Sequence, residues 1–319
     1  MITTRAICKD VANGNLRTSL YSDGTRHISY SGERMCPEYP VSLDVKITNW
    51  CDNPYCAAFC HEKSNKCGAH GDLSEGVRLL SELSEGSEIA IGGGATQSHP
   101  DLGSFLSQLK SRKLVPNLTI NQFHLNKELF DNLSRFSSEG TIGGVGISIN
   151  PNQHNEWLKP LTESNHVVLH AIAGIHSVDE VKKLSEELPA AKILVLGYKY
   201  YGNGLNYAKI KGSQIHSKLL DWSRRVNLFF GGATISFDNL ALEQLEVKRF
   251  FAPERWGGLY QGDDGTISMY LDLVEKKAAM TSRSSEKVAT QGRSLKELFD
   301  AVKRRVIVPK SQKILHEEN

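Results

Sequence analysis

The sequence has no cysteine beyond Cys67, although the chain runs on to residue 319. All six cysteines lie in the N-terminal part, and four of them fall between residues 51 and 67. The later part of the chain therefore supplies no thiolate. Any site built from several thiolates has to be assembled near the N-terminal end.

Long apolar runs are also lacking. No segment approaches the roughly 20 apolar residues that span a membrane. The first residues, MITTRAICKDVANGNLRTSL, lack the basic start and apolar stretch of a signal peptide. We therefore expect a cytoplasmic protein without a membrane partner. Because thiols stay reduced in the cytosol, a disulfide interpretation of the cysteines is weakened, and metal or redox chemistry is favoured.

Neither sign of charge dominates the composition. The chain has 38 Lys and Arg against 36 Asp and Glu, and its net charge is +2. This near-balance predicts no broad nucleic-acid-binding patch and no general attraction to acidic membranes. With 319 residues, 39% of them hydrophobic, the chain is long enough to bury a large core, as one large domain or one with small extensions.

Short apolar strands alternate with amphipathic helices through the middle of the chain. Predicted strands include VSLDVKITN, EIAIGGG, VPNLTIN, GGVGISIN, HVVLHAIAG and AKILVLGYK. This alternation predicts parallel strands joined by right-handed crossovers. We expect an α/β fold with a partial or full (β/α) TIM-type barrel, and an open doubly wound sheet is the alternative. In either fold, functional residues gather at the carboxyl ends of the strands.

The two flanks have a different pattern. LRTSLYSDGTRHISYS predicts an N-terminal β-hairpin that turns at Asp23 and Gly24. NLFFGG predicts a last barrel strand. GLYQGDDGTISMYLDLVEKKAAMT predicts a second hairpin turning at Asp264 and Gly265, and SLKELFDAVKRR a closing helix. We therefore expect an N-terminal extension over residues 1–40, a barrel over 41–250 and a C-terminal hairpin-plus-helix extension over 251–319.

The loop after the first predicted barrel strand, TNWCDNPYCAAFCHEKSNKCGAHGD, contains four cysteines. With His61 and His70 nearby, this group could bind zinc. Unrelated structural cysteines are a second interpretation, because buried thiols are common. The third is an iron–sulfur cluster, which takes its thiolates from short loops of this kind. The position at the carboxyl end of a barrel strand favours this third interpretation.

The loop resembles that of the radical S-adenosylmethionine (SAM) superfamily, in which three cysteines after the first barrel strand hold a [4Fe-4S] cluster that binds SAM. The resemblance matches Cys51, Cys56 and Cys60 to these ligands. Each gap is one residue longer than the usual pattern. Phe59 occupies the place of the aromatic residue that packs near the adenine in this family. Cys67 is then interpreted as a bystander.

The resemblance extends to IAIGGGATQSHPDL, which is similar to the family's glycine motif, where the SAM amino group binds. The matching cofactor-binding residues are Gly92, Gly93 and Gly94. Ala95 stands where a Glu is usual in the family. At later strand ends, the resemblance implies that Asn121 and Ser148 contact SAM. Ordinary capping of the strand ends is the alternative for both residues.

Three stretches are candidate substrate elements. In GYKYYGNG, Lys199 could bind a carboxylate or phosphate and Tyr201 could stack on a ligand; a surface turn is the alternative. In SFDN, Asp238 lies at the expected mouth of the barrel, with a helix N-cap as the alternative role. His61 and Glu62 follow the last proposed cluster ligand and could hydrogen-bond beside the cluster.

Over roughly Leu16 to Ser285 the chain resembles a group of radical SAM proteins from bacteria and their phages. The resemblance implies an enzyme that uses a [4Fe-4S] cluster to cleave S-adenosylmethionine reductively to a 5′-deoxyadenosyl radical. The radical abstracts hydrogen from a peptide, protein or nucleotide substrate. An external flavodoxin- or ferredoxin-like electron donor is implied, and an auxiliary cluster is not expected.

Two alternatives to this enzyme stay open. One is a zinc-stabilised binding protein. The other is a barrel that binds SAM or a cluster without catalysing a reaction, which Ala95 and the stretched cysteine spacing keep open.

Overall fold

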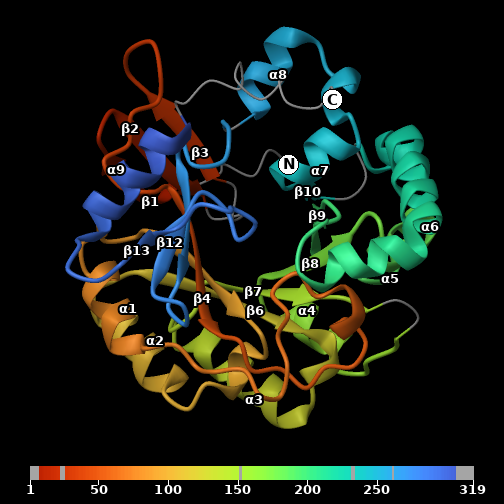
Figure 1. Ribbon diagram of the computed structural model, residues 1–319, viewed down its shortest axis with the longest axis horizontal. Coiled ribbons are helices and arrows are strands. Elements are labelled where there is room, and N and C mark those ends of the chain that lie inside the picture. Colours follow the sequence, from red (N-terminus) through yellow and green to blue (C-terminus); the bar gives the residue numbers. More distant parts are fainter. Residues whose placement is uncertain (1–6, 22–25, 151–152, 231–233, 261, 307–319) are drawn as a thin grey trace, which may run out of the picture.

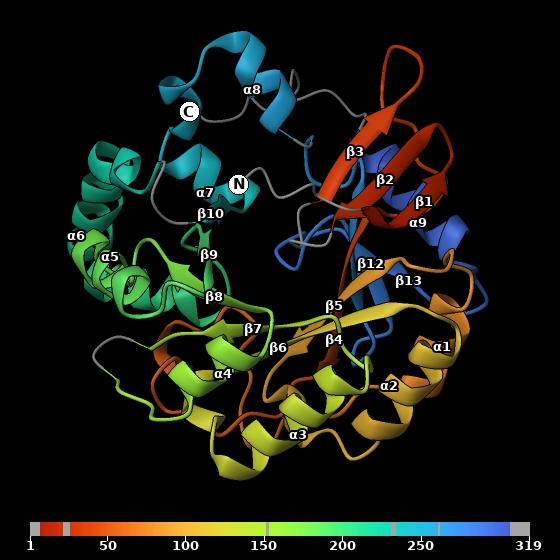
Figure 2. The same cartoon turned by 180° about the vertical axis from the view of Figure 1, so that it is seen from behind.

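The computed structural model describes residues 7–21, 26–150, 153–230, 234–260 and 262–306. It contains a ten-stranded sheet, in the order β10-β9-β8-β7-β6-β5-β4-β11-β12-β13, and a separate three-stranded sheet, β1-β2-β3. Figures 1 and 2 show the large sheet curved into an incomplete barrel, with helices α1 to α6 around its outside. No helix among the described residues is long and apolar enough to cross a membrane.

The central strands of the large sheet follow the predicted alternation. They are β4 (Ser42–Thr48), β5 (Glu88–Gly93), β6 (Val115–Asn121), β7 (Gly144–Ser148), β8 (Val167–Ile172), β9 (Lys192–Leu196) and β10 (Ile235–Phe237). Each pairs in parallel with the next. The helices are α1 (Leu73–Leu80), α2 (Leu102–Ser111), α3 (Lys127–Ser138), α4 (Leu158–Ser164), α5 (Val178–Glu187), α6 (Asn203–Arg225), α7 (Asn239–Gln244), α8 (Pro253–Leu259) and α9 (Leu295–Val306).

The side chains of β4 show how the two faces of the sheet divide. Leu43, Val45 and Ile47 are buried in the main hydrophobic core beneath the helices. Asp44 and Lys46 alternate with them and therefore point to the opposite face, into the barrel. The inner face thus carries ionisable groups and the outer face carries the apolar contacts that stabilise the fold.

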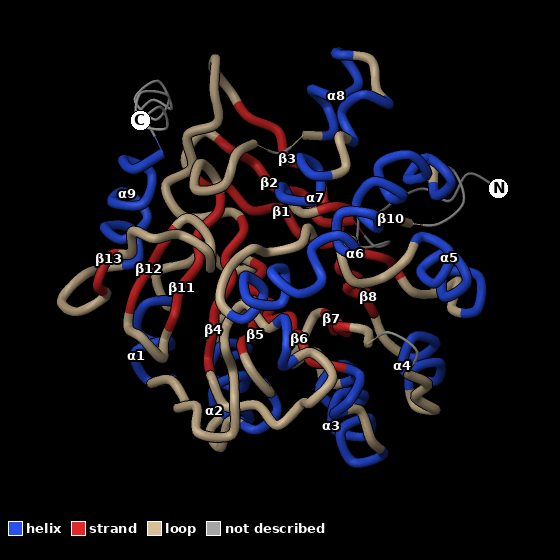
Figure 3. The backbone as a smooth tube through the Cα atoms, turned by 45° about the vertical axis from the view of Figure 1, so that its right-hand side comes forward, coloured by secondary structure: helices blue, strands red, loops and turns tan. Residues whose placement is uncertain are grey.

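The α/β prediction is confirmed in its partial-barrel form. Within the described part of the chain, β10 and β13 are the two edges of the large sheet and do not pair with each other. The barrel is therefore open on one side. The tube view in Figure 3 shows the parallel strands, with the loops that leave them at one end.

The C-terminal hairpin forms, but its predicted turn at Asp264 and Gly265 is wrong. β11 (Ser268–Asp272) begins after these residues and pairs antiparallel with β12 (Lys277–Ala279). The turn lies after Asp272, whose carboxylate accepts hydrogen bonds from the backbone N–H groups of residues 274 and 275. β11 also pairs in parallel with β4, so this segment extends the barrel sheet, and the short strand β13 (Val288–Ala289) follows β12.

The segment NLFFGG does not form the predicted last strand. Residues Val226–Phe229 form a 3-10 turn, and the last parallel strand is β10; residues 231–233 lie outside the described part. The reason is tertiary. The ring of Phe229 stacks on Trp222 with centroids 5.5 Å apart, and both side chains are buried. Apolar residues that suit a strand are here used for packing against α6.

The N-terminal prediction found two of three strands. β2 (Leu16–Tyr21) and β3 (Arg26–Tyr30) pair antiparallel as expected; Asp23 and Gly24 lie outside the described residues. An additional strand, β1 (Ile7–Asn13), pairs with β2. The two turn residues are Gly14, at φ 60°, and Asn15, so the dipeptide Gly14-Asn15 was the available signal.

Candidate functional site

The cysteine loop leaves the carboxyl end of β4. Cys56 precedes and Cys60 follows a 3-10 turn, Ala57–Phe59, in which the Phe59 N–H donates to the Cys56 carbonyl at 3.1 Å. Burial, together with the neighbouring Cys60 and Cys51, raises the pKa of Cys56 to about 12. Burial also raises the pKa of Cys51, with Cys60 adding to the rise. The three predicted ligands are thus brought together on one partly buried loop.

The other described cysteines are more exposed than this group. Cys67 and Cys36 are exposed, and all five described cysteines are free thiols. Among the described residues, no three His, Cys, Asp or Glu side chains are arranged to hold a single metal ion. An iron–sulfur cluster distributes its thiolates over different irons, so its ligands need not converge on one point.

Backbone hydrogen bonds fix the loop to its neighbours. The Gly94 N–H donates to the Thr48 carbonyl at 2.8 Å, and the Ala95 N–H donates to the Trp50 carbonyl at 2.7 Å. On the other side, the Asn203 N–H at the start of α6 donates to the Cys60 carbonyl at 3.1 Å. The loop is therefore held between the end of β5 and the first turn of α6.

The predicted glycine motif has a packing role that the structure makes explicit. A Cβ on Gly94 would lie 2.1 Å from the Trp50 carbonyl oxygen, and one on Gly93, at φ 127°, would lie 2.4 Å from the Thr48 carbonyl oxygen. Gly92 has more room, with Thr119 at 3.6 Å. Gly93 and Gly94 thus allow the strand end to approach the cysteine loop, where a side chain would collide with backbone.

Asn121 and Ser148 lie at the same edge of the barrel because they are register partners on β6 and β7. The Asn121 side chain caps the next 3-10 turn, accepting from the Phe123 N–H at 2.9 Å. Its amide group also donates to Asn150 at 3.0 Å. The capping role that we gave as the alternative for Asn121 is therefore present in the structure.

Phe59 faces a small cavity of about 260 Å³. Its ring meets that of Tyr207 edge-on with centroids 5.7 Å apart, and both residues line the cavity with Gly174 and Ile175 from the end of β8. The predicted aromatic position therefore forms part of the apolar wall of a pocket beside the cysteine loop, whose lining also includes Lys211 and Lys218.

His124 was missed by the sequence analysis, although it follows the end of β6 and so lies where barrel sites form. Its Nε2 lies 4.0 Å from the Cys51 sulfur, and its Nδ1 lies 3.6 Å from an Asp52 carboxylate oxygen. Burial lowers the pKa of His124, and Asp52 opposes this in part. The Asp52 oxygen and the amide nitrogen of Asn53 are buried without a hydrogen-bond partner.

A buried group of charges lies beneath the loop. The Lys46 ammonium is 2.8 Å from Glu62 and 3.3 Å from Asp272, and the side chains of Lys46 and Asp272 are 5% and 1% exposed. The Tyr270 hydroxyl donates to Glu62 at 3.1 Å. Burial opposes the charge on Lys46, but Glu62 and Asp272 outweigh it and raise the pKa of Lys46. This group ties the loop to β4 and β11.

His61 and Lys199 continue this group toward the interior of the barrel. The Lys199 ammonium lies 3.1 Å from Nε2 of His61 and 3.3 Å from the Ser282 hydroxyl. Burial lowers the pKa of Lys199, against the attraction of Asp238 and Asp44. Lys199 is therefore half-buried and its ammonium is held by the cysteine loop and Ser282, which differs from the free surface turn that we gave as its alternative.

The other two candidate substrate residues behave differently from Lys199. Tyr201 is 41% exposed. Asp238 is the N-cap of α7 and accepts from the Ala241 N–H at 2.7 Å, so the capping role holds for this residue. Burial raises the pKa of Asp238.

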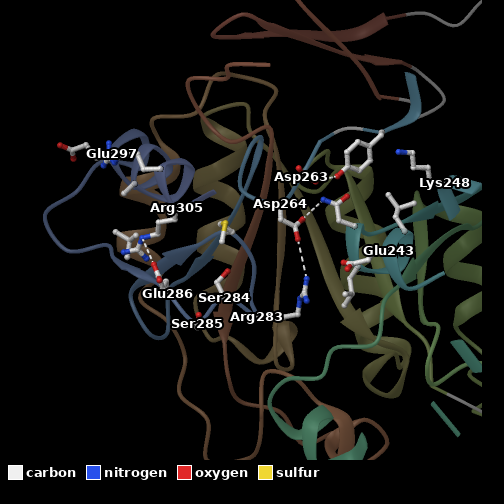
Figure 4. A pocket seen from close by; sticks show the side chains of 18 of the residues that line it. Glu243, Lys248, Asp263, Asp264, Arg283, Ser284, Ser285, Glu286, Glu297 and Arg305 are labelled. Carbon is white, nitrogen blue, oxygen red and sulfur yellow. Dashed lines mark hydrogen bonds and ion pairs between the residues drawn. The ribbon is translucent and has the colours of Figure 1, made fainter. Parts of the chain in front are cut away.

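A large cavity of about 1740 Å³ lies between α7 and α8 on one side and β13 and α9 on the other. Figure 4 shows Lys248 and Glu243 on one wall and Arg305 with Glu286 on the opposite wall. Asp264 lies between them, 3.8 Å from Arg283. The lining contains side chains of both charge signs. This cavity occupies the open side of the barrel.

Comparison with solved structures identifies the fold. The crystal structure of Streptococcus suis SuiB bound to precursor peptide SuiA matches with a TM-score of 0.59 at 13% identity, over 85% of this chain and 67% of that one. SuiB bound to S-adenosylmethionine matches with a TM-score of 0.57 at 12% identity, over 85% and 68%. Native anSMEcpe with bound AdoMet and Cp18Cys peptide matches with a TM-score of 0.50 at 12% identity, over 83% and 81%.

The chain therefore shares its fold with these solved proteins, which are radical SAM enzymes. The fold resemblance expected from the cysteine loop and the glycine motif is therefore confirmed. No protein-family model and no curated protein sequence matches the chain.

Proposed function

We propose that the protein is a radical SAM enzyme in which Cys51, Cys56 and Cys60 hold a [4Fe-4S] cluster. The observation that carries this proposal is the placement of the three thiols on one loop at the carboxyl end of β4, in a radical SAM fold. Two further features support the fit. The thiols are near enough to raise one another's pKa, and the buried amide nitrogen of Asn53 is a donor without a partner inside the same loop.

SAM would bind beside this loop, against the strand end that carries Gly92, with its nucleoside toward Phe59. When bound, the two cofactors would supply an electron and a 5′-deoxyadenosyl radical that abstracts hydrogen from the substrate. The residues of this chain orient and shield them. Gly94 keeps the end of β5 against the loop, while Phe59 and Tyr207 form an apolar wall that excludes water on one side.

The substrate that we propose is a peptide or protein segment rather than a nucleotide. The 1740 Å³ cavity on the open side of the barrel is large enough for several residues, and its lining includes five basic and five acidic side chains. Such mixed charge suits a polypeptide better than a polyanion. The fold is shared with SuiB bound to a precursor peptide, which agrees with this choice. Lys199, Tyr201 and Asp238 are the candidate substrate-handling residues, with Lys199 the one inside the barrel.

The decisive experiment is anaerobic reconstitution with iron and sulfide, followed by dithionite and SAM. We expect about four irons per chain, as a [4Fe-4S] cluster contains, and release of 5′-deoxyadenosine. The Cys60→Ala variant should lose the iron and the release of 5′-deoxyadenosine, whereas the Cys67→Ala variant should keep both. A stoichiometric zinc site without a cluster would refute the proposal. A cluster without SAM cleavage, with peptides present, would instead support the non-catalytic barrel.

A further inference from the structure

We propose that the outer face of the cysteine loop and the first half of α6 form the docking surface for an acidic one-electron carrier protein of the flavodoxin type. This inference rests on the proposed function, because it assumes a cluster behind the loop that needs one electron from outside. We call this surface the donor face. It consists of the apolar residues Tyr55, Ala57, Ala58 and Leu205 and the basic residues Lys63, Lys66, Lys209 and Lys211.

The apolar part of the donor face lies directly over the proposed ligands. Ala57 and Ala58 are exposed and stand between Cys56 and Cys60, so a protein that covers them lies over the turn that carries both proposed ligands. Tyr55 is 50% exposed and Leu205 is 47% exposed. Large apolar side chains that are exposed on one surface are typical of contact sites.

The loop and α6 form one continuous surface. The Asn203 side chain donates to the Ala57 carbonyl at 3.0 Å, and the Asn203 N–H donates to the Cys60 carbonyl at 3.1 Å. Gly202 packs so closely that a Cβ there would lie 2.1 Å from the His61 carbonyl oxygen. Figure 1 shows the loop passing beside the start of α6. The two segments can therefore be covered by one partner.

The charge of the donor face favours an acidic partner protein. Between residues 53 and 71 the sole acidic residue is Glu62, which is bound to Lys46, and residues 203–220 contain no acidic residue. Within the described part of the chain, Lys63, Lys66 and Lys209 form no ion pair. Since the whole chain carries a net charge of only +2, this is a local excess of positive charge. It complements an acidic carrier and would steer it to the cluster.

The cavity and the donor face serve different partners. The large cavity opens between α7, α8 and α9 and has mixed charges, whereas the donor face has one sign of charge and surrounds the cysteine loop. An electron carrier and a peptide substrate would therefore not compete for one surface. In the transfer itself the carrier is oxidised by one electron and the cluster is reduced by one electron.

The test compares two reductants on the reconstituted protein. The first protein is the double variant Lys66→Glu/Lys209→Glu. At low salt, we expect reduced flavodoxin to reduce its cluster at least about tenfold more slowly than that of the unchanged protein. Reduction by dithionite, which needs no docking, should be unchanged. Added salt should remove the difference between the two proteins.

A matched control reverses the charge at two lysines near the opposite end of the strands. It is the double variant Lys110→Glu/Lys113→Glu, at and just after the end of α2. It should leave flavodoxin-dependent reduction unchanged. The docking proposal is overturned if the donor-face variant is reduced by flavodoxin at the normal rate, or if the control slows equally. It is also overturned if the donor-face lysines bind duplex DNA while flavodoxin-dependent reduction does not depend on them.

Failure of the proposed function gives a different result. A chain that assembles no reducible cluster with dithionite contradicts the enzyme assignment itself. Flavodoxin binding to the iron-free chain, measured by interferometry, tests the surface without a cluster: the donor-face variant should bind more weakly than the control. Equal binding by the two variants would refute the docking surface.

Discussion

Replacing Lys46 by methionine tests whether the buried charges hold the cysteine loop. Met has a similar length and removes the ammonium group, so Glu62 and Asp272 would be left as two buried carboxylates without their cation. Removing one partner of a buried ion pair costs about 3–5 kcal/mol. We expect a loss of this size in the free energy of unfolding of the iron-free chain, measured by denaturant titration.

Two controls separate this effect from the loss of any lysine. Lys113→Met removes an ion pair with Glu85 whose side chains are 70% and 67% exposed, and it should cost less than about 1 kcal/mol. Combining Lys46→Met with Glu62→Gln and Asp272→Asn should restore part of the loss, because the uncompensated charges are removed. Our reasoning would be refuted if Lys46→Met cost no more than Lys113→Met.

The pH dependence gives a further check on the same group. Burial would raise the pKa of Glu62, but His61 and Lys46 outweigh it and hold the pKa well below its usual value. We attribute the larger part of this lowering of the Glu62 pKa to Lys46, because Nε2 of His61 already accepts a hydrogen bond from Lys199. A lowered pKa contributes stability above about pH 4.3, the unfolded value, and this stability is lost as the pH falls below it. The difference between the unchanged protein and Lys46→Met should therefore shrink between pH 7 and pH 3.

Three other changes give separate tests. Gly94→Ala should destabilise the chain and abolish SAM binding measured by calorimetry, because its Cβ would lie 2.1 Å from the Trp50 carbonyl oxygen; unchanged SAM affinity would contradict the close approach. Cys67→Ala should leave the iron content and the cluster's electron paramagnetic resonance spectrum unchanged, and loss of iron would overturn the ligand assignment. His124→Leu should lower the cluster's midpoint potential by roughly 40 mV, since a hydrogen bond to sulfur of about 1 kcal/mol favours the reduced, more negative state. His124→Gln, which keeps a donor, should shift it less, and equal shifts would exclude the hydrogen bond to Cys51.

Local sequence patterns were sufficient to predict the barrel. The strand–helix alternation predicted the parallel sheet because a buried strand and an amphipathic helix each have their own periodicity. A helix between two strands returns the chain to the same end of the sheet, so the neighbouring strands run parallel. The cysteine loop and the glycine motif were recognised because both are contiguous in the chain. Predictions failed where a local signal competed with distant packing. Phe229 was needed against Trp222, and the hairpin turn was fixed by Asp272 rather than by Asp264 and Gly265.

The sequence by itself determined which thiols are available, where they lie relative to the first barrel strand, and that glycines follow the second. Only the tertiary structure decided what surrounds them. Asp272 is far from Lys46 in the chain, and the two meet because β11 pairs in parallel with β4, while the loop after β4 brings Glu62 to the same ammonium group. His124 reaches Cys51 because the parallel strands β4 and β6, on either side of β5, end at the same edge of the barrel. Such contacts depend on strand order and on the geometry of burial, which no short stretch of sequence specifies.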